Sequence, residues 1–385
     1  MKQIHKLYLS NFLTGLVFWY GIEKLFMKSI GIDTVGIGYL TILIAIFTLI
    51  FDIPSGVIAD KWSRKYMLVV AALSLGICSI LLGVSNDIKV YATGYIFYGL
   101  YIVSTSGTYQ AIMYDSLHEE GRSKEYSKIN GRAYSLFLVG AGIANIASGF
   151  LANSYSYRFN YFITGVSCLI NIALIFTLNE PKFHNPEHKK NFLTDITSTV
   201  KEIVKNRLLL ILAIILGLST FVEVFKGDFG QIYMLRYVSS AQLVGILWAA
   251  YAFAWAFGGL IAHRLRGKLS LLVVFATLPY FIIALVDKWP SLIFFLIQAI
   301  ASAALVNQID TRVQEATPSR LRATITSVLS LIGRVVVIPA SMIIGYTLRN
   351  YNAFIGARVV AIVAALILLV WIILGNKEVQ KSTNL

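Results

Sequence analysis

Residues 52–65 read DIPSGVIADKWSRK, and this charged stretch separates two long apolar blocks. Neither the block before it, 40–51, nor the block after it, 67–84, contains a charged residue. The hydrocarbon core of a bilayer is about 30 Å thick, and a helix needs about 20 apolar residues to cross it. The pattern therefore predicts two membrane-spanning helices joined by a tight, basic turn.

Similar apolar blocks recur along the whole chain of 385 residues, of which 57% are hydrophobic and only 14% are charged. A soluble protein carries about 25% charged residues. We therefore expect an all-α membrane protein with about twelve spans. The predicted spans are 7–28, 37–59, 66–85, 90–116, 127–152, 159–178, 207–227, 240–263, 269–286, 290–312, 323–348 and 354–375.

The formal net charge is +14, which in a soluble protein would suggest nucleic-acid binding. Here most of the 33 lysines and arginines lie at span ends on one side of the predicted membrane. The positive-inside rule assigns that side to the cytoplasm, and an even number of spans then places both termini there. Short loops without an Asn-x-Ser/Thr site favour the cytoplasmic membrane of a prokaryote.

Other targeting and redox signals are weak. Cys78 and Cys168 lie inside apolar blocks, so they are expected to behave as small hydrophobic residues and predict no disulfide framework. The basic residues 1–6 precede a long apolar stretch without a small-residue cleavage site. We interpret that stretch as a retained first span and not as a signal peptide.

The longest connection, 179–206, divides the chain into two predicted six-helix bundles, 1–178 and 207–385. Apolar residues recur in it at helical spacing and predict an amphipathic helix on the inner membrane surface. These residues are Phe192, Ile196, Val200, Ile203 and Val204. The halves also share a motif, because GVIAD at 56–60 corresponds to GLIAH at 259–263. Such repetition is typical of transporters built from a duplicated bundle.

Two motifs resemble those of a known family. Residues 56–65 resemble the loop G-x-x-x-D-x-x-G-R-[RK] of the major facilitator superfamily (MFS), with Ser63 where the family prefers Gly. GTYQAIMYDSL at 107–117 is similar to the string G-x-x-x-A-x-x-Y-D-S-L of a drug-exporter-like subgroup. The resemblance covers nearly the whole chain and implies two pseudo-symmetric six-helix bundles.

The same resemblance implies a conformational latch in the turn after span two. Gly56 lets the backbones approach, Asp60 faces the start of span eleven, and Arg64, next to Lys65, pairs with Asp115 at the end of span four. These contacts would join the two halves on the cytoplasmic side when the carrier is open to the outside. The alternative is a solvated basic turn that serves only to set topology.

Ionisable residues inside spans are functional candidates, because a buried charge is costly unless it is paired or hydrated. A carboxyl group whose pKa rises on desolvation can bind a proton in one state and release it in another. Glu23, Glu223 and Asp310 are our candidates for proton coupling, followed by Asp52, which adjoins the turn. The alternative for Glu23 and Glu223 is a hydrated position near the outer edge of the membrane.

Cations near these acids extend the hypothesis. Lys24 adjoins Glu23, and Lys226 lies one turn beyond Glu223. Arg334 is closest to the membrane midplane, where it is expected to neutralise Asp310 or to bind an anionic substrate.

In the MFS arrangement spans one, four, seven and ten line the central cavity, so their polar and aromatic residues are candidates for substrate contact. An aromatic wall suits a bulky amphipathic or weakly cationic solute, although tyrosine is also common in packing and in interfacial belts. The candidates are Trp19, Tyr20, Tyr98, Tyr101, Thr105, Tyr109, Gln298, Asn307 and Gln308, with Arg334 as a further one.

We expect a secondary active transporter that moves a small organic solute by alternating access, with proton-coupled export as the leading hypothesis. Proton-coupled uptake of a sugar, amino acid or nucleoside is the alternative, and a non-transporting membrane receptor is a third. Catalytic, metal and nucleotide motifs are not found, so neither an enzyme nor a cofactor is expected. The expected partners are the solute, protons and the lipid bilayer, without nucleic acid, and the chain is expected to be a monomer.

Overall fold

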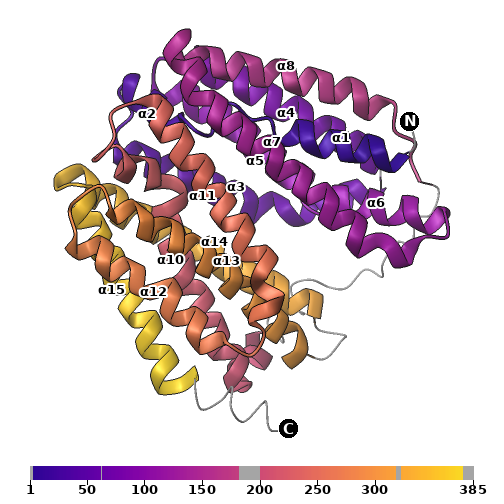
Figure 1. Ribbon diagram of the computed structural model, residues 1–385. Coiled ribbons are helices and arrows are strands. Elements are labelled where there is room, and N and C mark those ends of the chain that lie inside the picture. The colour runs from indigo at the N-terminus through magenta and orange to yellow at the C-terminus, as the bar shows by residue number, and fades with distance from the viewer. Residues whose placement is uncertain (1–2, 62, 182–199, 318–321, 376–385) are drawn as a thin grey trace. The chain divides into compact units, whose positions relative to one another are not determined.

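The computed structural model describes residues 3–61, 63–181, 200–317 and 322–375, and in these ranges the chain forms helices and no strand (Figure 1). The first half contains α1 (Gln3–Gly15), α2 (Glu23–Ser29), α3 (Thr34–Lys61), α4 (Arg64–Val84), α5 (Ile88–Thr105), α6 (Thr108–Glu119), α7 (Tyr126–Ser154) and α8 (Tyr157–Phe176). The second half contains α10 (Arg207–Met234), α11 (Ala241–Ile261), α12 (Leu269–Leu285), α13 (Ser291–Ala316), α14 (Arg322–Asn350) and α15 (Ala353–Val370). Short 3-10 helices lie at Ser123–Glu125 and Ala262–Leu265, and Trp371–Gly375 ends the described chain as a π-helix.

The chain divides into two compact units. Unit 1 comprises Met1–Gly36, Ile42–Glu187 and Ser239–Ala252, and unit 2 comprises Ile37–Thr41, His188–Val238 and Phe253–Leu385. The expected linker, 179–206, is described only at its two ends, and its residues Phe192 and Ile196 lie outside the described residues. The boundary of the two bundles therefore remains a prediction, whereas 200–205 are helical as expected.

The same helix pairings occur in both units. In unit 1, α4 packs against α5 and α8, and α1 packs against α7 and α8. In unit 2, α12 packs against α13 and α15, and α10 packs against α14 and α15. In chain order these are equivalent partners, so the packing supports the internal repeat inferred from the sequence.

One arginine contact is also repeated. The guanidinium group of Arg158, in the first turn of α8, donates to Gly83 O at 2.6 Å and lies 5.4 Å from the ring centre of Phe26. Arg358, near the start of α15, donates to Ala284 O at 3.3 Å and lies 4.7 Å from the ring centre of Phe354. In each unit an arginine near the start of the last helix thus binds a carbonyl group at the C-terminal end of a helix it packs against, α4 or α12. The helix dipole favours a cation at this end.

Nine helices of the described chain are long and apolar enough to cross a membrane. Among the expected spans, 269–286 corresponds to α12, an apolar helix of 17 residues with Pro279 inside it. The expected spans 7–28 and 90–116 are each interrupted, as α1 and α2 and as α5 and α6. The all-helical membrane fold is therefore confirmed, and the count of twelve spans remains a prediction.

The helices of spans one and four are interrupted. In span four, Gly107 adopts φ 71° and precedes α6, a left-handed conformation that glycine accepts without a steric penalty. In span one, residues 16–22 leave the helix, and Phe18 N donates to Thr164 Oγ1 at 3.0 Å. Non-helical backbone at membrane depth must be buried in protein or line water, and Val17, Trp19, Gly21 and Ile22 are all buried.

Small residues bring α1 and α7 together. A Cβ atom at Gly15 would lie 2.2 Å from Phe137 O, and one at Gly140 would lie 2.4 Å from Phe12 O. Only glycine fits at such backbone contacts, which are typical of helix pairs in membranes. Gly15 of α1 and Gly140 of α7 therefore allow the two backbones to approach closely just before the break in span one.

Candidate functional site

The turn between α3 and α4 is anchored by ionic contacts within unit 1. Arg64 forms an ion pair with Asp115 in α6, and both side chains are largely buried, with 15% and 10% of their surface exposed. This is the pair expected from the sequence, and its role as a conformational latch remains a prediction. The surroundings of Gly56 and the side chain of Asp60 are not among the described parts of the chain, so the contact expected for Asp60 stays a prediction as well.

A second acid, Glu180, binds the start of α4. Its carboxylate accepts from Ser63 Oγ at 2.7 Å and from the backbone N–H groups of Arg64 and Lys65, each at 2.9 Å. Lys65 Nζ donates to Phe176 O at 2.8 Å. The first N–H groups of a helix have no internal partner and favour an anion. Ser63, in place of the family's glycine, thus adds a hydroxyl donor to this anchor.

Glu23 belongs to a closed polar cluster beside the break in span one. Its carboxylate accepts from Lys24 Nζ at 2.8 Å and from Tyr95 Oη at 2.5 Å. Glu23 is 8% exposed and Lys24 is 3% exposed. Both carboxylate oxygens of Glu23 are bound, and the ion pair with Lys24 is buried. These contacts favour a fixed position of α2 against α5.

Glu223 belongs to a more open pair on α10. Its carboxylate lies 2.7 Å from Lys226 Nζ, and the Glu223 side chain is 27% exposed whereas that of Lys226 is fully buried. The ammonium group also lies 4.8 Å from the ring centre of Trp255 in α11. A buried ammonium group is favourable only with such compensation. The two glutamates thus differ in exposure, since the carboxylate of Glu23 is buried and that of Glu223 is partly accessible.

The three other charged candidates lie on three different helices, α3, α13 and α14. Asp310, on α13, is exposed, and Asp52, on α3, is half-buried. Arg334 lies on α14, and both expectations for it, an ion pair with Asp310 and contact with an anionic substrate, stay predictions.

Four of the predicted cavity residues form one aromatic cluster in unit 1. The ring centres of Trp19 and Tyr20 are 4.5 Å apart, those of Trp19 and Tyr98 are 5.7 Å apart, and those of Tyr98 and Tyr101 are 5.9 Å apart. Tyr20 Oη and Tyr98 Oη share a hydrogen bond of 2.8 Å. The break in span one turns Trp19 and Tyr20 toward α5. The cluster therefore depends on the break in span one as much as on the spacing of Tyr98 and Tyr101 along α5.

Tyr109 and Thr105 lie deeper inside unit 1. Tyr109 Oη is hydrogen-bonded to Ser10 Oγ at 2.8 Å and to Thr14 Oγ1 at 2.9 Å, and Asn171 joins the same network. With Thr105, Tyr109 lines a cavity of about 10 Å³, the volume needed by one water molecule. This interior is too small for an organic solute, so the network favours a packing role for these two residues.

The amide candidates on α13 also bond within unit 2. Gln298 Nε2 donates to Ser302 Oγ at 2.6 Å, and Gln308 Nε2 donates to Ala262 O at 2.7 Å. Both glutamines are buried, whereas Asn307 is exposed and bonds to Ala303 O in the preceding turn. Of the three, Asn307 is thus the one whose side chain is accessible.

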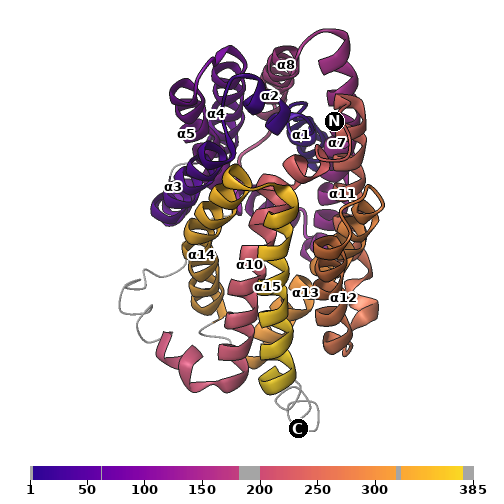
Figure 2. The ribbon, with the colours of Figure 1, turned by 90° about the vertical axis from the view of Figure 1, so that its left-hand side faces the viewer.

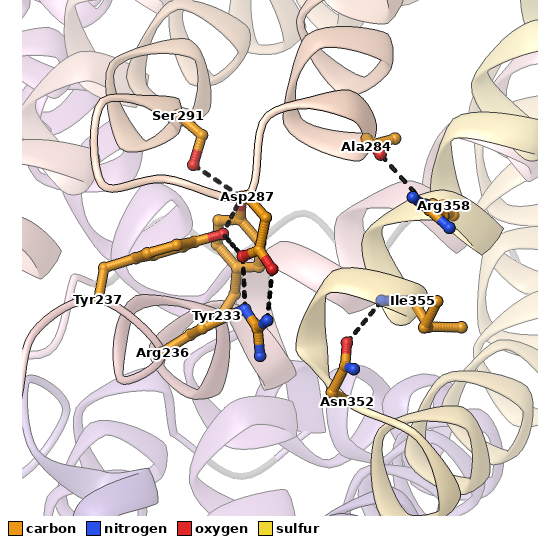
Figure 3. A network of polar contacts seen from close by, with 9 residues as sticks. All are labelled: Tyr233, Arg236, Tyr237, Ala284, Asp287, Ser291, Asn352, Ile355 and Arg358. Atoms are coloured by element: carbon orange, nitrogen blue, oxygen red, sulfur yellow. Dashed lines mark hydrogen bonds and ion pairs between the residues drawn. The ribbon is translucent and has the colours of Figure 1, made fainter.

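A polar network joins the end of α10 to the loop between α12 and α13, as Figure 3 shows. Arg236 binds Asp287 with two nitrogens, and the Nε to Oδ1 distance is 2.6 Å. Tyr237 Oη donates to the same carboxylate at 3.0 Å, and Tyr233 Oη bonds to Ser291 Oγ at 2.9 Å. The hydrogen bonds from Arg236 lower the pKa of the Asp287 carboxyl below its ordinary value, and the bond from Tyr237 adds to this effect. The network therefore fixes the end of α10 to the loop between α12 and α13.

Comparison with known proteins identifies the family. The family model described as Major Facilitator Superfamily matches residues 7–341. The chain belongs to this superfamily. It is therefore a membrane transporter by family and not an enzyme, in agreement with its all-helical fold.

The relatives of this MFS chain are distant. Multidrug resistance protein 2 of Bacillus subtilis (strain 168) is 22% identical over 236 residues, which cover 58% of this chain and 58% of that protein. Multidrug resistance protein 1 of the same organism is 25% identical over 164 residues, which cover 43% of this chain and 41% of that protein. The chain thus spans about half the length of the curated relatives it matches.

Solved structures agree over a larger part of the chain. The nucleoside transporter NupG matches with a TM-score of 0.78 at 14% identity, over 96% of this chain and 99% of that one. A bacterial homolog to the human lysosomal transporter Spinster, in an inward-facing and occupied conformation, matches with a TM-score of 0.75 at 16% identity, over 97% and 96%. At these identities the match establishes the MFS fold alone.

Several residues of this MFS chain that bear on the candidate sites were missed by sequence reasoning. Tyr95 and Trp255 complete the two acid–lysine clusters, and Glu180 anchors α4. Asp228 is a further half-buried acid on α10. Asp228 was missed because the predicted span ended at residue 227, whereas α10 continues to Met234. For the aromatic partners no sequence signal existed, because their contacts join helices that are distant in sequence.

Proposed function

We propose that this MFS transporter exports small amphipathic organic compounds in exchange for protons, by alternating access. The proposal is supported by the two distant relatives named as multidrug resistance proteins and by the aromatic cluster around Trp19. The observation that carries the proton coupling is the Glu223–Lys226 pair, whose acid is accessible while its base is buried.

The coupling follows from the cost of breaking this pair. Protonation of Glu223 removes one of the interactions that compensate the charge of the fully buried Lys226. Because compensation of a buried charge is then weaker, the conformation that contains this pair becomes less favourable. Proton binding at Glu223 would thus favour a second conformation, and loss of the proton would favour the first.

The test uses the purified full chain in proteoliposomes with an imposed pH gradient. Amphipathic organic solutes are added, and a pH indicator inside the vesicles follows proton movement. We expect protons and solute to move in opposite directions, and Glu223→Gln to abolish the proton signal. The double variant Glu223→Gln/Lys226→Met removes both charges of the pair, so we expect it to fold while coupling stays lost. Glu125→Gln, an exposed acid in a 3-10 turn, is the matched control that should retain coupling.

Three results separate the alternatives. Full coupling in Glu223→Gln would refute the assignment of the proton to this residue. Protons that enter together with the solute would show uptake instead of export. No solute movement by the wild-type protein with any compound would favour a receptor.

A further inference from the structure

Unit 2 contains an apolar groove that the proposed transport mechanism does not use. The groove has a volume of about 400 Å³ and lies between α10, α14 and α15, next to the helical residues 200–205. Figure 2 shows α10, α14 and α15 side by side on one face of unit 2. No residue that lines the groove carries a polar side chain; on α10 the lining residues include Leu210, Ala213, Gly217 and Phe221.

The position of the groove restricts what can fill it. Its three walls are candidate membrane spans, so it faces either protein or hydrocarbon. A purely apolar cavity does not hold ordered water, because water needs polar partners. The lining of α10 extends from Leu210 to Phe221, which at 1.5 Å per residue is about 16 Å. One leaflet of a bilayer core is about 15 Å thick. The length therefore suits an acyl chain of a single leaflet.

Positively charged residues lie beside one end of the groove. Val200, Ile203 and Val204 line the groove, and Val200 and Val204 are 43% and 59% exposed. Lys201 and Lys205 are also exposed, and because they are four residues apart they lie on one helix face beside these valines. Arg207 follows at the start of α10, and Glu202 is the one acid in this segment. A helix with an apolar face and adjacent lysines is typical of an interfacial segment that attracts anionic headgroups.

We infer that the groove binds one acyl chain of an anionic phospholipid, whose headgroup lies against Lys201 and Lys205. The lipid joins the linker helix to α10 and α14 and stabilises unit 2. Gly217 forms the floor of the site, since a Cβ atom there would lie 3.7 Å from both Ile332 Cγ2 and Val336 Cγ2. A larger side chain at this position would occupy the space of the acyl chain without meeting backbone.

The experiment compares phosphatidylglycerol with phosphatidylcholine of the same acyl chains. Each lipid is titrated into delipidated full-length protein in detergent, and the melting temperature and the lipid-bound mass are measured. A ligand that binds only the folded state raises the melting temperature. We expect phosphatidylglycerol to act at lower concentration. Lys201→Ala/Lys205→Ala should weaken its binding about 25-fold, at about fivefold per lysine, and Gly217→Leu should abolish binding of both lipids.

Matched controls are available in unit 1. Lys124 and Lys128 are also exposed and four residues apart, and Gly131 is a helical glycine with no atom within 4 Å of a Cβ. Lys124→Ala/Lys128→Ala and Gly131→Leu should therefore bind as the wild type does. Val336→Phe fills the same groove and replaces Gly217→Leu if that variant does not fold.

The inference is overturned if the two lipids act equally on the wild type or if the lysine double variant keeps its preference. It is also overturned if both groove-filling variants retain lipid, because the headgroup site would then act without the groove. The groove would be assigned to a solute instead if neither lipid binds in it and a lipophilic organic cation stabilises the wild type but not the groove-filling variants.

Discussion

At the residue scale, the contacts that hold the candidate site differ in how far the sequence revealed them. The pair of Arg64 and Asp115 was expected, because both residues lie in recognisable motifs. The anchor formed by Glu180 was not, since a single acid before a proline carries no motif. The partner of Arg334 stays a prediction, because depth in a span does not show which face of a helix a residue occupies. A motif thus predicts a partner where depth in a span does not.

Asp287 offers a residue-scale test in the network that fixes the end of α10. The folded protein lowers the pKa of its carboxyl, mainly through the hydrogen bonds from Arg236. A lowered pKa means that the stabilisation is present above the ordinary aspartate pKa of about 3.9 and is lost as the pH falls through the folded value. We expect Asp287→Asn to melt below the wild type at pH 7 and the two melting temperatures to converge below about pH 3.9. A difference that stays constant down to pH 3 would contradict this assignment.

At the element scale, the sequence predicted the positions of the helices and most of their ends. It did not predict that the helices of spans one and four are interrupted. Apolar blocks predicted the helices, and Ser63, Asp87, Ser156 and Asn352 each accept a hydrogen bond from the first turn of the helix that follows. Gly15 ends α1 directly before the break in span one, but a single glycine in an apolar block does not by itself predict a break. The break is fixed by tertiary contacts, such as the bond of Phe18 N to Thr164, which are invisible to local propensity.

Gly107 allows the break in span four to be tested. Its φ of 71° is strained for any residue with a Cβ atom, and a Cβ there would meet nothing within 4 Å. Gly107→Ala should therefore lower the free energy of unfolding by about 1 kcal/mol through backbone strain alone. Gly107→Asn should lose less, since asparagine tolerates the left-handed region. Gly131→Ala, in a regular helix without contacts, should not destabilise the protein, and equal losses in the two alanine variants would show that span four is not broken at Gly107.

At the scale of the whole molecule, the sequence predicted the fold class and the superfamily, and it could not predict substrate or coupling. The duplicated motif at 56–60 and 259–263 foretold the repeated helix pairings, because duplication preserves both sequence and packing. Glu23 and Glu223, which lie in the first and the second half of the chain, differ in exposure because different residues pack around them. Symmetry in the chain therefore predicts architecture more reliably than it predicts function.

The position of the termini is the last whole-molecule prediction. An even number of spans and the excess of basic residues on one side place both termini in the cytoplasm. Green fluorescent protein fused to either terminus should fluoresce, and alkaline phosphatase fused to either terminus should be inactive, because each reporter functions on one side of the membrane only. A reporter inserted after Asn86, in the turn between α4 and α5 that is predicted to face outward, should give the opposite pattern. If the two termini gave different patterns, the number of spans would be odd, and the interrupted helices α1–α2 and α5–α6 would be the first candidates for a segment that enters the membrane without crossing it.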